Sequence, residues 1–163
     1  MAKNKEEKTN VMRVLEQKKI AYTAHTYPHE EGMAVDGATV AQSMGFDPAI
    51  VFKTLVARGA SKQYYVFDVP VAENLDLKKA AKAVGEKSIE MIHQKELLPL
   101  TGYVHGGCSP VGMKKLFPTV FHSSAENLAA MIVSAGKIGY QVELAPRDLA
   151  ALVRAKFADI IVE

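Results

Sequence analysis

Two apolar segments separated by four residues constrain the fold of this chain more than any other feature. Residues 50–58 (IVFKTLVAR) and 63–69 (QYYVFDV) are rich in β-branched and aromatic side chains, which favour strands. Residues 59–62, which begin with a glycine, connect them. A connection of about four residues is typical of antiparallel neighbours, so the sequence predicts a β-hairpin here.

Capping residues and turn signals place the other elements. Thr9, Asp36 and Asp76 are candidate N-caps, and Gly45 and Gly85 can end the helices that follow the last two. The predicted helices span residues 9–19, 36–44, 76–84, 93–98 (stopped by Pro99) and 146–155. The predicted strands, besides the hairpin, span residues 22–27, 88–91, 119–122, 130–134, 140–144 and 160–162.

Short strands interspersed with helices are typical of an α+β domain with a mixed, largely antiparallel sheet. No repeat, low-complexity tract or linker divides the sequence. We therefore expect a single domain over residues 9–163, preceded by a frayed N-terminus over residues 1–8. Residues 28–36 (PHEEGMAVD) are expected to form a polar loop long enough to arch over a neighbouring surface.

The composition excludes several classes of protein. With 48% apolar and 23% charged residues, the 163-residue chain fits a globular domain in water. A single cysteine excludes an intramolecular disulfide and a cysteine-rich zinc site, and agrees with a reducing compartment. No apolar run reaches the length of a membrane span, and residues 1–10 lack the apolar core of a signal peptide, so we expect a cytoplasmic protein. A net charge of +2 allows a nucleic-acid partner without requiring one.

Residues 106–112 (GGCSPVG) form a loop with three glycines and a proline. Such a loop is either a tight turn without a ligand or a set of uncovered backbone N–H groups, which attract oxyanions. Cys108 within it has no adjacent Lys, Arg or His that would lower the pKa of its thiol. We therefore predict that Cys108 is a small apolar filler and not a nucleophile.

Lys53 lies inside the first predicted hairpin strand. It shares one face with Val51 and Leu55, while Phe52 and Thr54 lie on the other. Because both faces carry apolar residues, the ammonium must either enter a polar pocket or extend to solvent. In a pocket it would bind a phosphate, a carboxylate or a carbonyl oxygen.

The common catalytic and cofactor motifs are absent, so no metal or cofactor is expected. The five histidines show no metal-ligand spacing, Ser109 lacks the GxSxG motif, and no nucleotide-phosphate loop is present. A basic surface is the remaining signal, either as an ordinary solvated helix face or as phosphate contacts of a nucleic acid. Its candidate residues are Lys78, Lys79, Lys82 and Lys137, and Lys114 and Lys115 could belong to the same surface.

Five segments in a fixed order resemble the YbaK/EbsC family, the free-standing relatives of the editing domain of bacterial prolyl-tRNA synthetase. The segments are residues 25–27 (HTY), 51–55 (VFKTL), 75–82 (LDLKKAAK), 106–112 (GGCSPVG), and 133–137 (VSAGK) taken together with 142–146 (VELAP). Each is weak by itself, but the combination is specific. The subgroup that the chain most resembles is the Cys-tRNA(Pro) deacylases, and the resemblance spans about residues 9–163.

The resemblance implies a partly barrel-like sheet surrounded by helices, with a pocket lined by the matched segments. Lys53 would hold the terminal adenosine or the aminoacyl end, and the Gly106 and Gly107 backbone would face the ester carbonyl. The implied substrate-binding residues are Tyr27, Thr54, Ser109, Pro110, Ser134 and Gly136. Ala135 departs from the glycine that is common in this group, which could narrow the pocket or change a backbone angle.

The resemblance also implies a mechanism without a protein nucleophile. The thiol of a bound Cys-tRNA would attack its own ester carbonyl, and backbone donors would stabilise the oxyanion. An Ala-tRNA(Pro) deacylase and a non-catalytic module that binds tRNA or nucleotide are the alternatives. The implied partners are the aminoacylated 3′ end of tRNA and prolyl-tRNA synthetase, with no membrane contact, and the protein would be a monomer or weak dimer.

Overall fold

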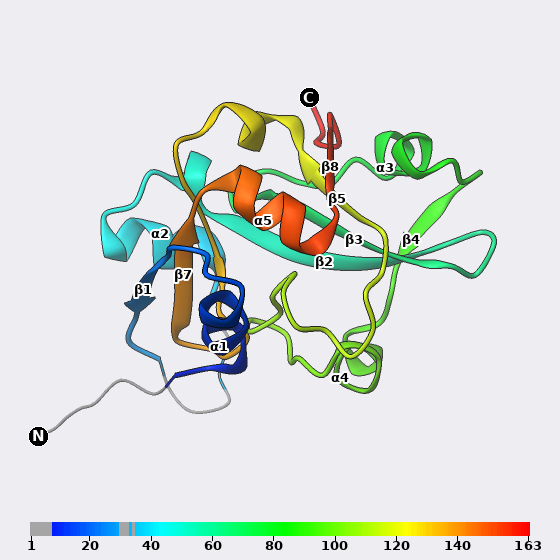
Figure 1. The fold of residues 1–163 in the computed structure, drawn as a ribbon. Coiled ribbons are helices and arrows are strands. Elements are labelled where there is room, and N and C mark those ends of the chain that lie inside the picture. Colours follow the sequence, from blue (N-terminus) through cyan, green and yellow to red (C-terminus); the bar gives the residue numbers. More distant parts are fainter. Residues whose placement is uncertain (1–7, 30–32, 34) are drawn as a thin grey trace, which may run out of the picture.

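The computed structural model describes residues 8–29, 33 and 35–163, and Figure 1 shows their arrangement. The frayed terminus predicted for residues 1–8 therefore lies outside the described residues except for Lys8, as does the middle of the polar loop predicted for residues 28–36. The predicted hairpin is confirmed: β2 (Phe52–Gly59) pairs antiparallel with β3 (Tyr64–Pro70). The Glu86 carboxylate fixes its turn by accepting hydrogen bonds from the Ser61 N–H (3.1 Å) and the Tyr65 hydroxyl (2.6 Å).

The strands form two sheets, and the mixed, largely antiparallel arrangement is confirmed. In the larger sheet the order is β4-β2-β3-β5-β8, and β5 and β8 run parallel to their neighbours. The smaller sheet, β1-β7-β6, is antiparallel throughout. A parallel bridge between Val51 and Ile132 joins the two sheets without closing them into one barrel. The remaining strands are β1 (Thr23–Thr26), β4 (Ile89–Met91), β5 (Thr119–His122), β6 (Met131–Ser134), β7 (Tyr140–Leu144) and β8 (Lys156–Ala158).

The predicted caps begin three of the helices. The Thr9 hydroxyl accepts from the Met12 N–H, Asp36 accepts from the Thr39 N–H, and Asp76 accepts from two N–H groups of the next turn. The helices are α1 (Asn10–Gln17), α2 (Gly37–Met44), α3 (Leu77–Val84), α4 (Gln94–Thr101) and α5 (Pro146–Val153), with 3-10 turns η2 (Pro48–Ile50) and η3 (Ser123–Asn127). Among the described residues, no helix is long and apolar enough to span a membrane.

Two predicted boundaries were wrong. Helix α4 continues through Pro99 and ends at Gly102, whose left-handed backbone (φ 89°) supplies the stop. Proline removes only one N–H donor, and this loss does not end the helix here. The terminal strand predicted for residues 160–162 does not form. Residues 156–158 pair with β5 instead, and Ile161 makes only an isolated bridge to Leu75.

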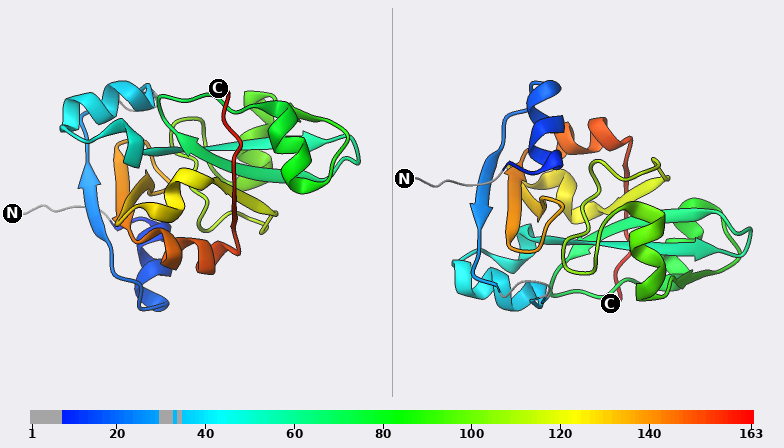
Figure 2. Two further views of the ribbon diagram at one scale, coloured as in Figure 1. Left: turned by 90° about the horizontal axis from the view of Figure 1, so that it is seen from above. Right: turned by 90° about the horizontal axis from the view of Figure 1, so that it is seen from below.

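The two faces of the larger sheet pack against different layers. Phe52, Val56 and Phe121 face the main core, which α1 and α5 complete. The three views show α1 and α5 on the same side of the molecule (Figures 1 and 2). Phe67 and Val69 on the opposite face pack with α3 in a second core. The chain after β3 adds β4 beside β2 and β5 beside β3. The glycine loop between these two strands lines a pocket together with the beginning of β2.

Candidate functional site

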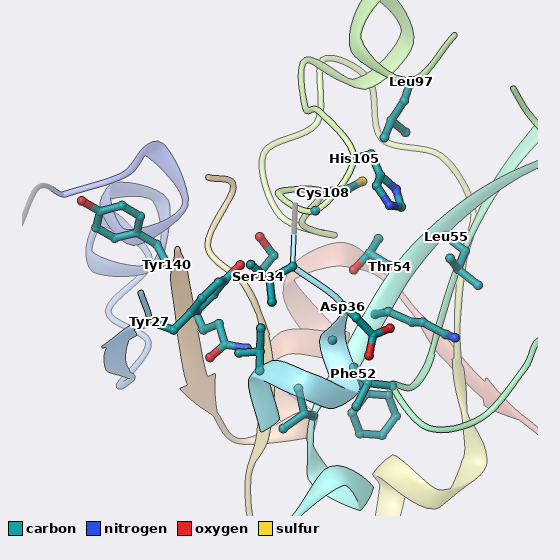
Figure 3. Close-up of a pocket in the computed structure, with 18 residues that line it drawn as sticks. Tyr27, Asp36, Phe52, Thr54, Leu55, Leu97, His105, Cys108, Ser134 and Tyr140 are labelled. Atoms are coloured by element: carbon teal, nitrogen blue, oxygen red, sulfur yellow. The ribbon is translucent and has the colours of Figure 1, made fainter. Parts of the chain in front are cut away.

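A pocket of about 500 Å³ lies where the start of β2 meets the smaller sheet and the glycine loop. Figure 3 shows its labelled residues converging from segments that are far apart in the chain, such as those that carry Tyr27, Thr54 and Ser134. Its apolar surface comes from residues such as Phe52, Val71 and Leu97, and its polar groups include Asp36 and His105. A volume of this size is typical of a site for a small ligand.

Strand β2 contributes to this pocket from both of its faces. Thr54 shares a face with Phe52 and points toward the main core, while Lys53 and Leu55 lie on the opposite face. All of these side chains line the pocket, because it extends around the beginning of the strand. The expectation that Lys53 lies between two buried faces needs correction, because residues 53–55 are only half-buried. Within the part of the chain that is described, Lys53 forms no ion pair, so its charge can meet a ligand.

The smaller sheet supplies the opposite wall. Tyr27 is buried there, and its N–H donates to the Gly139 carbonyl at 2.9 Å, which fixes its backbone. The Ser134 hydroxyl lines the pocket and accepts a hydrogen bond from the Gly136 N–H at 3.1 Å. Gln141 is only 7% exposed, and its Oε1 has no hydrogen-bond partner among the described residues. A buried acceptor without a partner is a costly group that a ligand can satisfy.

The glycine loop presents one of its two leading glycines to the pocket. Gly106 lines it with a left-handed backbone (φ 91°), and its N–H has no partner in the described residues. Gly107 is buried behind it, and its N–H donates to the Val104 carbonyl at 2.9 Å. A Cβ at Gly107 would lie 3.1 Å from the Ile138 nitrogen, so close packing explains this second glycine. The geometry therefore leaves Gly106 as the candidate oxyanion donor and does not support that role for Gly107.

Three other predicted substrate contacts lie behind the pocket. Ser109 is fully buried, and its hydroxyl accepts from the Val111 N–H at 3.2 Å, while Pro110 is buried beside it. Gly136 has a left-handed backbone (φ 93°), and a Cβ there would lie 2.9 Å from the Tyr103 ring. Neither Ser109, Pro110 nor Gly136 lines the pocket, so these residues shape the loops that surround it.

Cys108 and Ala135 are both core residues. Burial, with a smaller contribution from the Asp68 carboxyl, raises the pKa of the Cys108 thiol to about 12. A thiol with that pKa stays neutral near pH 7 and is a weak nucleophile, which agrees with the filler role. Ala135 is fully buried in the main core and does not line the pocket, so it does not narrow it.

The predicted phosphate contacts separate into three environments. Lys79 is held by Asp159 (3.1 Å), Glu163 (3.3 Å) and the Ile161 carbonyl (2.9 Å), so its charge is already used within the protein. Lys78 and Lys82 line a second, shallow groove on α3 with Lys87. Lys137 lies over the ring of Tyr140, with its Nζ 5.4 Å from the ring centroid, and Tyr140 lines the pocket.

Asp68 is the functional candidate that the sequence reasoning missed. Its side chain is completely buried, and it lies directly across from Thr54 in the hairpin register. The Thr54 hydroxyl donates to Oδ1 at 2.5 Å, whereas Oδ2 has no partner in the described structure. Burial raises the pKa of Asp68 to about 7, against a smaller lowering by the Thr54 hydrogen bond. The alternation of side chains along the strand could have predicted its burial, because Asp68 lies on the same face as Val66, which belongs to the main core.

The site therefore offers a cation, an uncovered backbone donor and a largely buried wall. The sequence reasoning also missed His105 and Gln141, although His105 directly precedes the glycine loop. Across the described ranges, no group of three or more His, Cys, Asp or Glu side chains could hold a metal ion. Such an arrangement can position an activated ester and stabilise the oxyanion that forms on its carbonyl oxygen.

Comparison with known proteins agrees with this chemistry. Residues 29–152 match the family described as the aminoacyl-tRNA editing domain. Over 161 residues the chain is 46% identical to EbsC of Enterococcus faecalis, named as a candidate Cys-tRNA(Pro)/Cys-tRNA(Cys) deacylase, and the alignment covers 98% of each chain.

Two solved structures share the fold. One is described as a candidate trans-editing enzyme for prolyl-tRNA synthetase, with a TM-score of 0.78, 25% identity and coverage of 94% of this chain and 95% of that one. A hypothetical protein with 19% identity has a TM-score of 0.82 and coverage of 93% and 99%. With the resemblance of the motifs confirmed over most of its length, the chain belongs to the aminoacyl-tRNA editing domain family and is an aminoacyl-tRNA deacylase.

Proposed function

We propose that this protein hydrolyses the ester of Cys-tRNA(Pro), and also that of Cys-tRNA(Cys), and thereby releases cysteine from tRNA in the cytoplasm. The observation that carries the proposal is the pocket that Lys53 and Gly106 both line, beside a Cys108 thiol that burial keeps neutral. The 46% identity to EbsC over nearly the whole chain supports the choice of cysteine as the aminoacyl group.

The substrate itself supplies the nucleophile in this proposal. The cysteinyl thiol loses its proton, and its sulfur attacks the carbonyl carbon of the same aminoacyl group. The bond to the ribose oxygen then breaks, that oxygen takes up a proton, and water opens the cyclic thioester to free cysteine. Intramolecular attack in a fixed geometry reaches effective molarities of about 10⁵–10⁸ M, which a shaped pocket can exploit.

Lys53 and Gly106 have separate roles in this scheme. The Lys53 ammonium binds an oxygen of the terminal nucleotide or of the aminoacyl group, because its charge is not used within the described part of the protein. The Gly106 N–H donates to the developing oxyanion, and one such donor is worth on the order of 10²–10³ in rate. Selection of tRNA(Pro) would come from prolyl-tRNA synthetase as a partner, because a net charge of +2 gives the protein only a modest attraction for tRNA.

Release of labelled cysteine from Cys-tRNA(Pro) tests the proposal. Lys53→Ala should lower kcat/KM by about 10- to 100-fold, the usual effect of losing a charged hydrogen bond. Lys62→Ala, at the exposed tip of the hairpin, is the matched control and should leave the rate unchanged. Equal rates for wild type and Lys53→Ala would remove Lys53 from the mechanism.

A substrate series separates the possible specificities. Ser-tRNA(Pro) and Ala-tRNA(Pro) keep the ester but lack the thiol, so both should be hydrolysed much more slowly than Cys-tRNA(Pro). Rapid release of alanine would instead make the protein an Ala-tRNA(Pro) deacylase. Binding of tRNA without any release would show a non-catalytic module. A pulldown with prolyl-tRNA synthetase and charged tRNA tests the delivery step, which fails if no ternary complex forms.

A further inference from the structure

A buried carboxyl lies one hydrogen bond behind the surface of the pocket. Thr54 lines the pocket, and its hydroxyl donates to Asp68 Oδ1 at 2.5 Å. Among the described residues, the buried side-chain oxygens without a partner are Asp68 Oδ2 and Gln141 Oε1. Gln141 lines the pocket, and Asp68 is linked to it through the Thr54 hydroxyl. Figure 3 shows Thr54 on the same side of the pocket as Cys108 and His105.

Of the groups around Asp68 that are named below, Thr54 is the one whose hydrogen bonding depends on the charge of the carboxyl. Phe121 on β5 lies opposite Asp68 in the sheet register and is apolar. The Cys108 thiol, from the glycine loop, has a pKa of about 12 and therefore stays neutral. Lys53 and His105 also line the pocket, but neither contributes to the pKa shift of Asp68, which comes from burial and from Thr54.

The protonation state of Asp68 determines which way the Thr54 hydroxyl faces. A carboxylate can only accept, so an ionised Asp68 holds the Thr54 proton and leaves the oxygen lone pairs of Thr54 for the pocket. A protonated Asp68 can donate to Thr54 instead, which frees the hydroxyl proton to turn toward the pocket. Toward the pocket, Thr54 can therefore donate only while Asp68 is protonated, and it is held as an acceptor once Asp68 is ionised.

We propose that Asp68 is a positioning residue that fixes Thr54 as a hydrogen-bond acceptor for a donor group of the aminoacyl substrate, either its ammonium or its thiol. The proposal rests on the proposed function, because the substrate contains these donors. Thr54 touches the substrate, and Asp68 acts only through Thr54. The acceptor form exists when Asp68 is ionised, so deacylation should increase as Asp68 loses its proton.

The pH dependence of kcat/KM for Cys-tRNA(Pro) tests the proposal with four proteins. Wild type and Thr54→Ser should both gain activity through about pH 7, where Asp68 ionises. Asp68→Asn should lack the part of this gain that comes from Asp68, because an amide does not titrate. Thr54→Val should lose it too, with kcat/KM lower by about tenfold at high pH. The substrate thiol and amino group titrate in all four assays, so the test is the difference in pH dependence between each variant and wild type. If kcat/KM of Asp68→Asn rises with pH in the same way as that of wild type, the proposal is overturned.

A binding measurement separates this proposal from the deacylase assignment. The probe is 3′-deoxy-3′-(cysteinylamino)adenosine, whose amide bond resists hydrolysis, and calorimetry gives its affinity at about pH 6 and pH 8. Thr54→Val should weaken binding by about tenfold at the higher pH and much less at the lower, while Thr54→Ser should match wild type. Equal affinities of wild type and Thr54→Val at both pH values would refute the role of Thr54, even if cysteine is released from tRNA. The same pattern of weakening without any cysteine release would instead support it and refute the deacylase assignment.

The alanyl counterpart of the probe identifies the donor. If the ammonium is the donor, the alanyl and cysteinyl probes should lose the same affinity in Thr54→Val. If the thiol is the donor, only the cysteinyl probe should lose affinity. Circular dichroism of each variant at both pH values verifies that the comparison is made between folded proteins.

Discussion

Replacing Asp68 with asparagine should change how the stability of the protein depends on pH. The carboxyl is completely buried, and its pKa rises from an ordinary value of 3.8 to about 7. Asparagine has nearly the same shape and can still accept from the Thr54 hydroxyl, but it carries no ionisable group. The variant therefore removes the titration while it preserves the packing.

The sign of the effect follows from proton binding. Between pH 3.8 and about 7 the folded protein keeps the Asp68 proton, while the unfolded chain has lost it. The free energy of unfolding of wild type therefore falls as the pH rises through this range. At about 1.4 kcal/mol per pH unit the loss is about 4 kcal/mol in total, of which about 3 kcal/mol falls between about pH 5 and pH 8. Asp68→Asn should not show this loss.

Urea denaturation followed by circular dichroism, at several pH values from about 5 to 8, measures the difference. The free energy of unfolding of Asp68→Asn should rise relative to wild type by about 3 kcal/mol across the series. Contributions from all other titrating groups cancel in this comparison. Asp47→Asn, which changes an exposed carboxyl and keeps a good N-cap, is the matched control and should run parallel to wild type. Parallel curves for Asp68→Asn and wild type would refute the reasoning.

Three further predictions concern residues around the pocket. Gly136→Ala should lower the free energy of unfolding by about 1–3 kcal/mol, because φ is 93° and a Cβ would lie 2.9 Å from the Tyr103 ring. Urea denaturation measures this change, and an unchanged urea midpoint would contradict it. Cys108→Ser should leave the rate of cysteine release within several-fold of wild type, and abolished release would make the thiol a nucleophile. Lys82→Ala should weaken tRNA binding and flatten the salt dependence of that binding. Lys79→Ala breaks the ion pairs with Asp159 and Glu163, so it should change thermal stability and leave the salt dependence of tRNA binding unchanged. Filter binding at several salt concentrations distinguishes the two variants.

Local signals in the sequence predicted most of the fold. The hairpin and the caps at Thr9, Asp36 and Asp76 depend on contacts within a few residues, so the sequence pattern determines them. The boundary at β8 was wrong because the pairing of Phe157 with Phe121 joins residues that are far apart in the chain. No local pattern distinguishes residues 156–158 from residues 160–162 as the segment that pairs with β5.

The candidate site was predictable only where a motif places a residue directly at the pocket. Lys53 and Gly106 line the pocket, whereas Gly107 and Ser109 use their polar groups inside the glycine loop. Within one short motif, a residue that faces a ligand and a residue that shapes the loop look alike in sequence. Lys79 illustrates the same limit, because the acidic residues that bind it follow it by about 80 positions.

The energetics of Asp68 connect the fold to the chemistry. At neutral pH a carboxylate among apolar core residues costs free energy that an apolar residue of similar size would not cost. The hydrogen bond from Thr54 offsets part of the cost, because it favours the ionised form and lowers the pKa. An isolated carboxyl deep in a core would have no functional effect, but this one is separated from the pocket by a single hydroxyl group. The same ionisation that weakens the folded state is therefore the one that would prepare Thr54 for the substrate, so stability and activity should change in opposite directions as the pH rises through 7.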